Sequence, residues 1–178
     1  GPMGRAGDGA GGWLVCAGGR REEGGGGRGS GERINTTGKK AMQAGLLAGD
    51  WGDARAQAVE QEEAGADILD VNAGLPEIDE KQALCKLVQA VQAVSDLPLQ
   101  IDCGKADAVE AALRVYAGKA IVNSVNGEDR VLNSILPVVK KYGAAVVGLT
   151  MDEHGIPTTA AERVRIAEKI IRTCASYG

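Results

Sequence analysis

The chain has 178 residues and a formal net charge of −4, a length that normally forms one domain with its own core. No Lys/Arg cluster alternates with aromatic residues, so a nucleic-acid surface is not expected. The apolar runs are too short to span a bilayer and there is no signal-peptide pattern, so we expect a cytoplasmic protein. Four scattered cysteines and a single His predict neither a metal site nor a disulfide framework.

Glycine is concentrated at the amino terminus, where 14 of the first 31 residues are Gly. Such a segment is costly to order and has few side chains to bury. Residues 1–31 are therefore predicted to be a separate tail, flexible or vector-derived. Its only apolar run, residues 13–15, leaves a second possibility, a short strand added to an exposed sheet edge.

From Glu32 onward the chain alternates between short apolar strands and amphipathic helices. Two of the strands contain the near-continuous apolar runs Ala-Ile-Val and Ala-Ala-Val-Val, which fit parallel strands buried on both faces. Alternation of this kind predicts right-handed crossovers and a parallel sheet. The predicted strands are 33–35, 67–71, 97–101, 120–123 and 144–149, and the predicted helices are 40–48, 53–64, 79–94, 106–116, 129–142 and 159–175.

The ends of the strands decide between two architectures for this sheet. A nucleotide-binding open sheet needs a Gly-rich turn after its first strand, and the only Gly-rich run here precedes that strand. A barrel instead has polar residues at the carboxyl end of successive strands. The predicted fold class is α/β, a TIM (β/α)8-type barrel with about five β/α units present. The polar strand ends are Asn35, Asp70 with Asn72, Asp102, Asn123 with Asn126, and Thr150 with Asp152.

Asp102 and Asn123 are the leading candidates for ligand binding. The two oxygens of a carboxylate can accept from a ring N–H and an adjacent amino group together, and an Asn amide both donates and accepts. This chemistry suits a pterin or a similar flat heterocycle. Alternatively, Asp102 caps a loop or helix, and Asn123 ties strand ends together.

The remaining candidates have simpler structural interpretations beside the functional one. Asp70 and Asn72 could hold the following loop, and Asn35 could be a turn residue. His154 is a lone His in a loop and is expected to face solvent. Cys103 is predicted to be a small packing residue, since no neighbour in the sequence would lower the pKa of its thiol.

Five segments, in order and at matching spacing, resemble the pterin-binding family: 31–38 (GERINTTG), 65–72 (GADILDVN), 100–102 (QID), 123–128 (NSVNGE) and 148–153 (GLTMDE). Within it they resemble the methyltetrahydrofolate-dependent corrinoid methyltransferases, which include the folate domain of cobalamin-dependent methionine synthase. The resemblance implies that residues 32–178 are the first part of a barrel with methyltetrahydrofolate at its carboxyl rim. It implies pterin contacts from Asp102 and Asn123, rim positions for Asp70, Asn72, Asn35 and Asn126, and methyl transfer to cobalamin on a partner protein or domain.

A complete TIM barrel takes about 250 residues, so we expect three β/α units to be missing. The first and fifth barrel strands would then be open edges, which predicts a homo-oligomer, recruitment of the tail as a strand, or partial disorder. The chain alone is expected to be inactive. Cys103 also replaces the Ser usual in the family. The alternative function is a non-catalytic engineered or truncated barrel fragment that self-associates, and a dihydropteroate-synthase-like condensation is disfavoured by the loops at 123–126 and 150–153.

Overall fold

The computed structural model describes residues 14–16, 34–35, 45, 48–74 and 78–178. Within these ranges the chain forms one six-stranded sheet in the order β1-β6-β5-β4-β3-β2, and every pairing is parallel. From β2 to β6 the spatial order of the strands follows the chain, as in a barrel. The strands are β1 (Leu14–Cys16), β2 (Ile34–Asn35), β3 (Leu69–Asn72), β4 (Leu99–Asp102), β5 (Ile121–Val125) and β6 (Ala145–Gly148).

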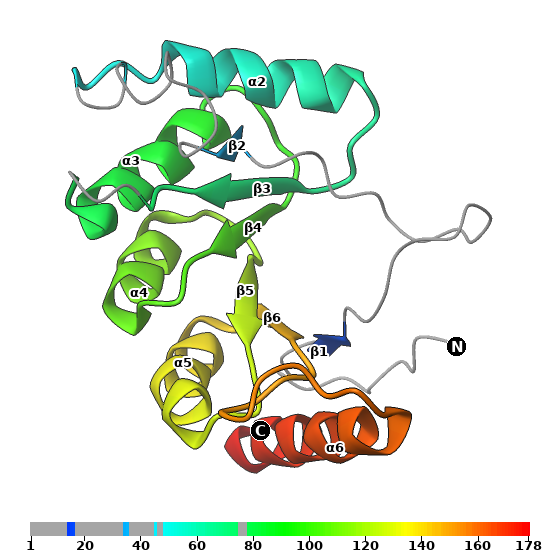
Figure 1. Cartoon of the computed structure of the whole chain (residues 1–178). Helices are drawn as coiled ribbons and strands as arrows, with labels where there is room; N and C mark the ends of the chain where they lie inside the picture. The colour runs from blue at the N-terminus through cyan, green and yellow to red at the C-terminus, as the bar shows by residue number, and fades with distance from the viewer. Residues whose placement is uncertain (1–13, 17–33, 36–44, 46–47, 75–77) are drawn as a thin grey trace.

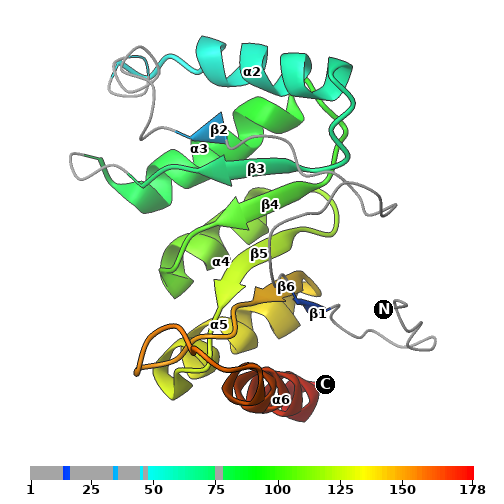
Figure 2. The same ribbon diagram turned by 45° about the vertical axis from the view of Figure 1, so that its right-hand side comes forward.

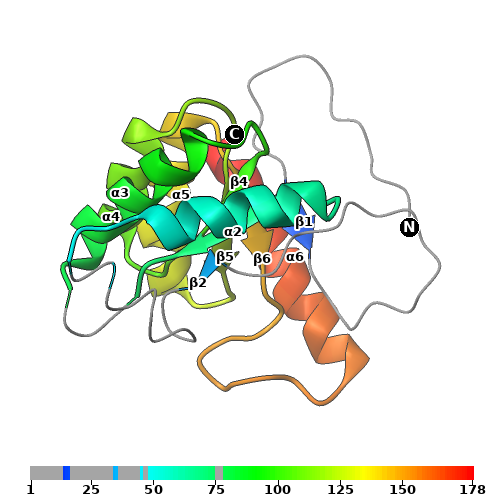
Figure 3. The same ribbon diagram turned by 90° about the horizontal axis from the view of Figure 1, so that it is seen from above.

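The helices alternate with these strands along the chain. Helices α3, α4 and α5 lie on one side of the sheet, while α2 and α6 lie at its two ends (Figure 1). The turned view in Figure 2 and the view from above in Figure 3 show the same one-sided arrangement. This one-sided helical layer is that of an incomplete barrel. The helices are α2 (Gly52–Glu63), α3 (Glu80–Gln92), α4 (Ala106–Val115), α5 (Asp129–Tyr142) and α6 (Ala160–Tyr177).

Helix α3 illustrates how the sequence builds this layer. Its apolar residues recur at three- and four-residue spacing and are fully buried against the sheet. Asp79 caps the helix, accepting hydrogen bonds from the backbone N–H groups of Lys81 at 3.0 Å and Gln82 at 3.4 Å. The buried α3 residues are Ala83, Leu84, Leu87, Val88, Ala90 and Val91.

The outer edge of β6 is covered by a strand from the amino-terminal segment. Strand β1 pairs with it in parallel, with Leu14 opposite Val146 and Cys16 opposite Gly148. Of the three outcomes expected for the open edges, the structure shows recruitment of the amino-terminal segment as a strand at the fifth barrel strand. This is the edge-strand alternative for residues 13–15, while most of the predicted helix 40–48 lies outside the described residues.

No helix in the described part of the chain is both long enough and apolar enough to cross a bilayer.

Candidate functional site

A row of polar residues crosses four adjacent strands: Asn35, Asn72 and Asp102 are the last residues of β2, β3 and β4, and Asn123 is the third residue of β5. The sheet register pairs Asn35 with Asn72 and Asp102 with Asn123. The pairing of β3 with β4 runs through Val71 and Ile101, so Asn72 and Asp102 follow as neighbours. Register partners in a parallel sheet point to the same face. The row therefore lies on one face at the carboxyl ends of the strands, with Asn35 placed in it by its backbone.

Asn72 ties two members of this row together. Its Nδ2 donates to the backbone carbonyl of Asp102 at 3.2 Å, and its Oδ1 accepts from the backbone N–H of Gly74 at 3.0 Å. The backbone N–H of Cys103 donates to the carbonyl of Asn123 at 3.1 Å. These hydrogen bonds connect the backbones of β3, β4 and β5 at the residues whose side chains are the candidate ligand groups. Asn72 does hold the loop, as its simpler interpretation predicts, and it also contacts Asp102.

Asp70 lies one layer deeper than this row. It pairs in register with Gln100, two residues before Asn72 and on the same face. Its side chain is buried, and its Oδ2 accepts from Gln100 Nε2 at 2.5 Å. Asp70 is therefore placed beneath Asn72 and Asp102, where it accepts a hydrogen bond from Gln100.

Asn126 lies in the turn between β5 and α5. Its Nδ2 donates to Glu128 Oε1 at 2.9 Å and its Oδ1 accepts from the backbone N–H of Glu128 at 3.0 Å. The next residue, Gly127, donates its backbone N–H to the carbonyl of Met151 at 2.8 Å. Asn126 therefore sits where the loops after β5 and β6 meet, with both atoms of its amide engaged in the turn.

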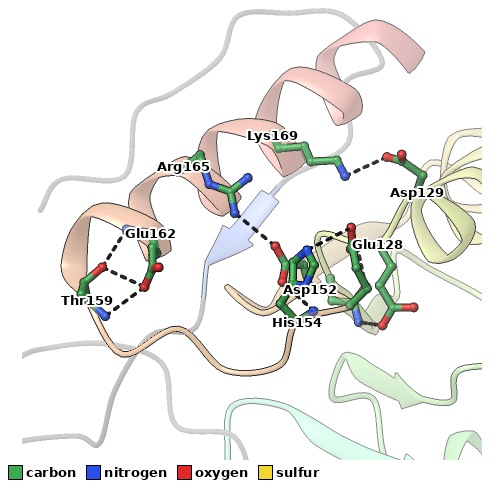
Figure 4. Close-up of polar contacts among 10 residues, drawn as sticks. Glu128, Asp129, Asp152, His154, Thr159, Glu162, Arg165 and Lys169 are labelled. Atoms are coloured by element: carbon green, nitrogen blue, oxygen red, sulfur yellow. Dashed lines mark hydrogen bonds and ion pairs between the residues drawn. The ribbon is translucent and has the colours of Figure 1, made fainter.

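One ion pair joins the loop after β6 to α6, and a second joins α6 to α5 (Figure 4). Asp152 Oδ1 accepts from the backbone N–H of His154 at 3.0 Å, and Oδ2 accepts from Arg165 at 3.3 Å. Lys169 pairs with Asp129 at 2.8 Å. The His154 side chain is 82% exposed, which confirms the prediction that it faces solvent. This cluster fastens α6 to the rim.

Cys103 belongs to a cluster that the sequence did not predict. Its thiol is buried and donates to Glu80 Oε1 at 3.3 Å, and Glu80 Oε2 pairs with Lys105 Nζ at 2.8 Å. Burial, the largest cause, raises the pKa of the Cys103 thiol to about 12. The thiol therefore stays protonated at neutral pH, and the prediction of a packing residue is confirmed.

In the part of the chain with described coordinates, no group of three His, Cys, Asp or Glu residues could hold a metal ion. The polar groups along the row are a carboxylate, which accepts hydrogen bonds, and amides, which both donate and accept them. They suit a neutral, flat ligand edge that carries both donors and acceptors. Among the described residues, this row is the arrangement that fits the ligand chemistry expected from the sequence.

Comparison with known proteins assigns the family. The pattern that defines the family described as "Pterin binding enzyme" matches residues 31–177. The chain belongs to this pterin-binding family. It is 31% identical over 152 residues to a methionine synthase of Mycobacterium leprae (strain TN), and 32% identical over 146 residues to that of Mycobacterium tuberculosis (strain ATCC 25618 / H37Rv). These matches cover 82% and 79% of this chain, but the chain spans only 12% of the length of either relative.

Solved structures support the same fold for this member of the pterin-binding family. A 7,8-dihydropteroate synthase from Vibrio fischeri ES114 superposes with a TM-score of 0.62 at 19% identity, and one from Xanthomonas albilineans with 0.57 at 22%. Each match covers 85% of this chain, and 57% and 55% of the respective structures. At these identities the likeness concerns the fold alone, and the partial coverage agrees with an incomplete barrel.

Proposed function

We propose that this chain binds the pterin ring of methyltetrahydrofolate at the row formed by Asn72, Asp102 and Asn123. Membership of the pterin-binding family and similarity to methionine synthases support this choice of ligand class. The single observation that carries the proposal is the register that pairs Asp102 with Asn123. Asn35 and Asn126 are proposed to complete the rim around the ring, with Asp70 buried in the layer beneath it.

Each residue of the row has a defined chemical task in this proposal. The Asp102 carboxylate accepts hydrogen bonds from a ring N–H and the adjacent amino group of the pterin. The Asn123 amide forms hydrogen bonds with a neighbouring donor and acceptor on the same ring. Asn72 holds the Asp102 backbone through its 3.2 Å hydrogen bond, so the carboxylate is set before the ligand arrives. Such preorganisation lowers the entropy cost of binding.

The finer proposal is that the bound methyl group passes to cobalamin carried on a partner protein or domain. The corrinoid supplies the nucleophile, and this chain orients the pterin and keeps the methyl-bearing nitrogen in place. Among the described residues, none has a proposed role as a general acid for the methyl-bearing ring nitrogen. We therefore propose ligand binding for the chain alone and methyl transfer only in a complete barrel.

Calorimetric titration with 5-methyltetrahydrofolate tests the binding proposal. Because hydrogen bonds to a charged group contribute about 1.5–3 kcal/mol, Asp102→Asn is expected to weaken binding by about 10- to 150-fold. The matched control is Asp96→Asn, an exposed Asp in the loop before β4, at the opposite end of that strand, which should bind like the unmodified chain.

Two outcomes would overturn the proposal. Equal affinity for the unmodified chain and Asp102→Asn would remove Asp102 from the site. If neither the unmodified chain nor any variant binds methyltetrahydrofolate, the alternative of a non-catalytic fragment that self-associates is favoured. Light scattering then tests self-association directly. A concentration-dependent increase in mass would support self-association through a sheet edge.

A further inference from the structure

Glu80 is the first residue of α3, yet its side chain contacts the loop that follows Asp102. Only 16% of the side chain is exposed. An acidic residue in the first turn often serves the helix terminus, but here Asp79 already caps the terminal N–H groups of Lys81 and Gln82. The Glu80 carboxylate is therefore available for contacts outside its own helix.

The first set of contacts reaches the loop after β4. Glu80 Oε1 accepts from the buried thiol of Cys103 at 3.3 Å, and Oε2 pairs with Lys105 at 2.8 Å. The backbone N–H of Lys105 also donates to Cys103 Sγ at 3.4 Å. Cys103 follows Asp102 directly, so the carboxylate holds the backbone from which the Asp102 side chain projects.

On its other side, Glu80 lies near Gly74 in the loop after β3. A Cβ atom added at Gly74 would lie 3.5 Å from Glu80 Oε1 and 3.4 Å from Asn72 Oδ1. Gly74 therefore passes close to both side chains, and its backbone N–H donates to Asn72 Oδ1 at 3.0 Å. Asn72 in turn donates to the backbone of Asp102. Hydrogen bonds and the chain itself thus connect Glu80 through Cys103 and Asp102 to Asn72 and Gly74, and Gly74 lies near the Glu80 carboxylate.

We propose that Glu80 is a positioning residue that fixes the loops after β3 and β4 relative to each other, so that Asn72 and Asp102 can bind the same ligand. This inference rests on the proposed pterin site and deepens it. The ion pair with exposed Lys105 contributes little, because surface pairs are screened by water. The hydrogen bond from the buried Cys103 thiol to Glu80 carries the effect, and the position of Glu80 beside Gly74 extends it to the loop after β3.

Variants of Glu80 and Lys105 separate these contributions. Glu80→Ala removes the acceptor and is expected to weaken 5-methyltetrahydrofolate binding about tenfold. Glu80→Gln keeps an oxygen that can accept from Cys103 and should restore most of the affinity. Lys105→Gln should change affinity less than about threefold. The control is Glu60→Ala, an exposed acid of α2, which should leave binding unchanged.

Labelling of Cys103 gives a readout that does not depend on the ligand. Brief exposure to iodoacetamide, followed by peptide mass spectrometry, measures how often the thiol becomes accessible. We expect little Cys103 labelling in the unmodified chain and in Glu80→Gln, and several-fold more in Glu80→Ala. Urea unfolding is measured in parallel, so that a rise in labelling at unchanged stability reports local loosening.

The outcomes separate this inference from the pterin proposal. If labelling rises in Glu80→Ala but no variant binds methyltetrahydrofolate, Glu80 positions the loops and the ligand assignment is wrong. If the unmodified chain binds but neither labelling nor affinity changes in Glu80→Ala, the positioning role is wrong. A loss of affinity in Glu80→Gln equal to that in Glu80→Ala would also contradict it, since the charge alone would then matter.

Discussion

The two faces of the central strands have opposite characters. On the side that faces the helices, Leu69, Val71, Leu99, Ile101 and Val122 are all fully buried. On the other side the same strands carry polar residues, namely Asp70, Asn72, Gln100, Asp102 and Asn123. The alternation of side chains along a strand lets one short segment serve both purposes. The helix-facing side stabilises the fold, and the opposite side arranges hydrogen-bonding groups.

The largest expected effect is on the helix-facing side. Ile101→Ala removes a fully buried side chain directly before Asp102 and should lower the free energy of unfolding by about 2–5 kcal/mol. Urea denaturation measures this. Ile171→Ala on α6, where the side chain is 47% exposed, is the control and should cost far less. Similar losses at both positions would mean that burial against the helices does not distinguish this face.

An intermediate effect is expected in the deep layer of the polar face. Gln100→Leu removes the 2.5 Å hydrogen bond to the buried Asp70 and should lower the free energy of unfolding by about 1–3 kcal/mol. A double-mutant cycle with Asp70→Asn measures the coupling between the two side chains. Additive effects would show that this contact does not stabilise the polar face.

The smallest effect is expected on the outer surface of the helices. A hydrogen bond from Lys141 to Glu110, and then the charge of Lys141, lower the pKa of Glu110 below its usual value of 4.5. Because a lowered folded-state pKa stabilises the charged form, this contribution is present above about pH 4.5 and is lost as the pH falls below it. Glu110→Gln should therefore slightly flatten the fall of Tm between about pH 6 and pH 3. Unchanged pH dependence would contradict the pairing.

The sequence predicted those parts of the structure that depend on local pattern. The predicted helices 79–94, 106–116 and 129–142 match α3, α4 and α5 within two residues, because apolar residues at helical spacing face the sheet. The polar residues expected at strand ends likewise indicated Asp102, which ends β4, and Asn123, which lies inside β5 beside it. Strand β5 extends two residues beyond its prediction, to Val125, because its register with β6 shifts after Asn123.

Contacts between distant parts of the chain could not be predicted in the same way. Glu80 and Cys103 are 23 positions apart, and nothing in either local sequence marks them as partners. Cys103 was predicted to be a packing residue because no neighbour in the sequence would lower the pKa of its thiol, but its donor role depends on where α3 begins relative to β4. Asp70 was grouped with the rim, although the register sets it one layer lower. Such details follow from tertiary placement.

Strand β1 has a consequence for any larger assembly that contains this sheet. A strand edge can form one ladder of backbone hydrogen bonds at a time, and residues 14–16 occupy that of β6. Any further strand, whether from the same polypeptide or another molecule, must displace this segment to join β6. Extension of the sheet on that side therefore exchanges β1 for another strand. The equilibrium is set by the difference in free energy between the two strand pairings.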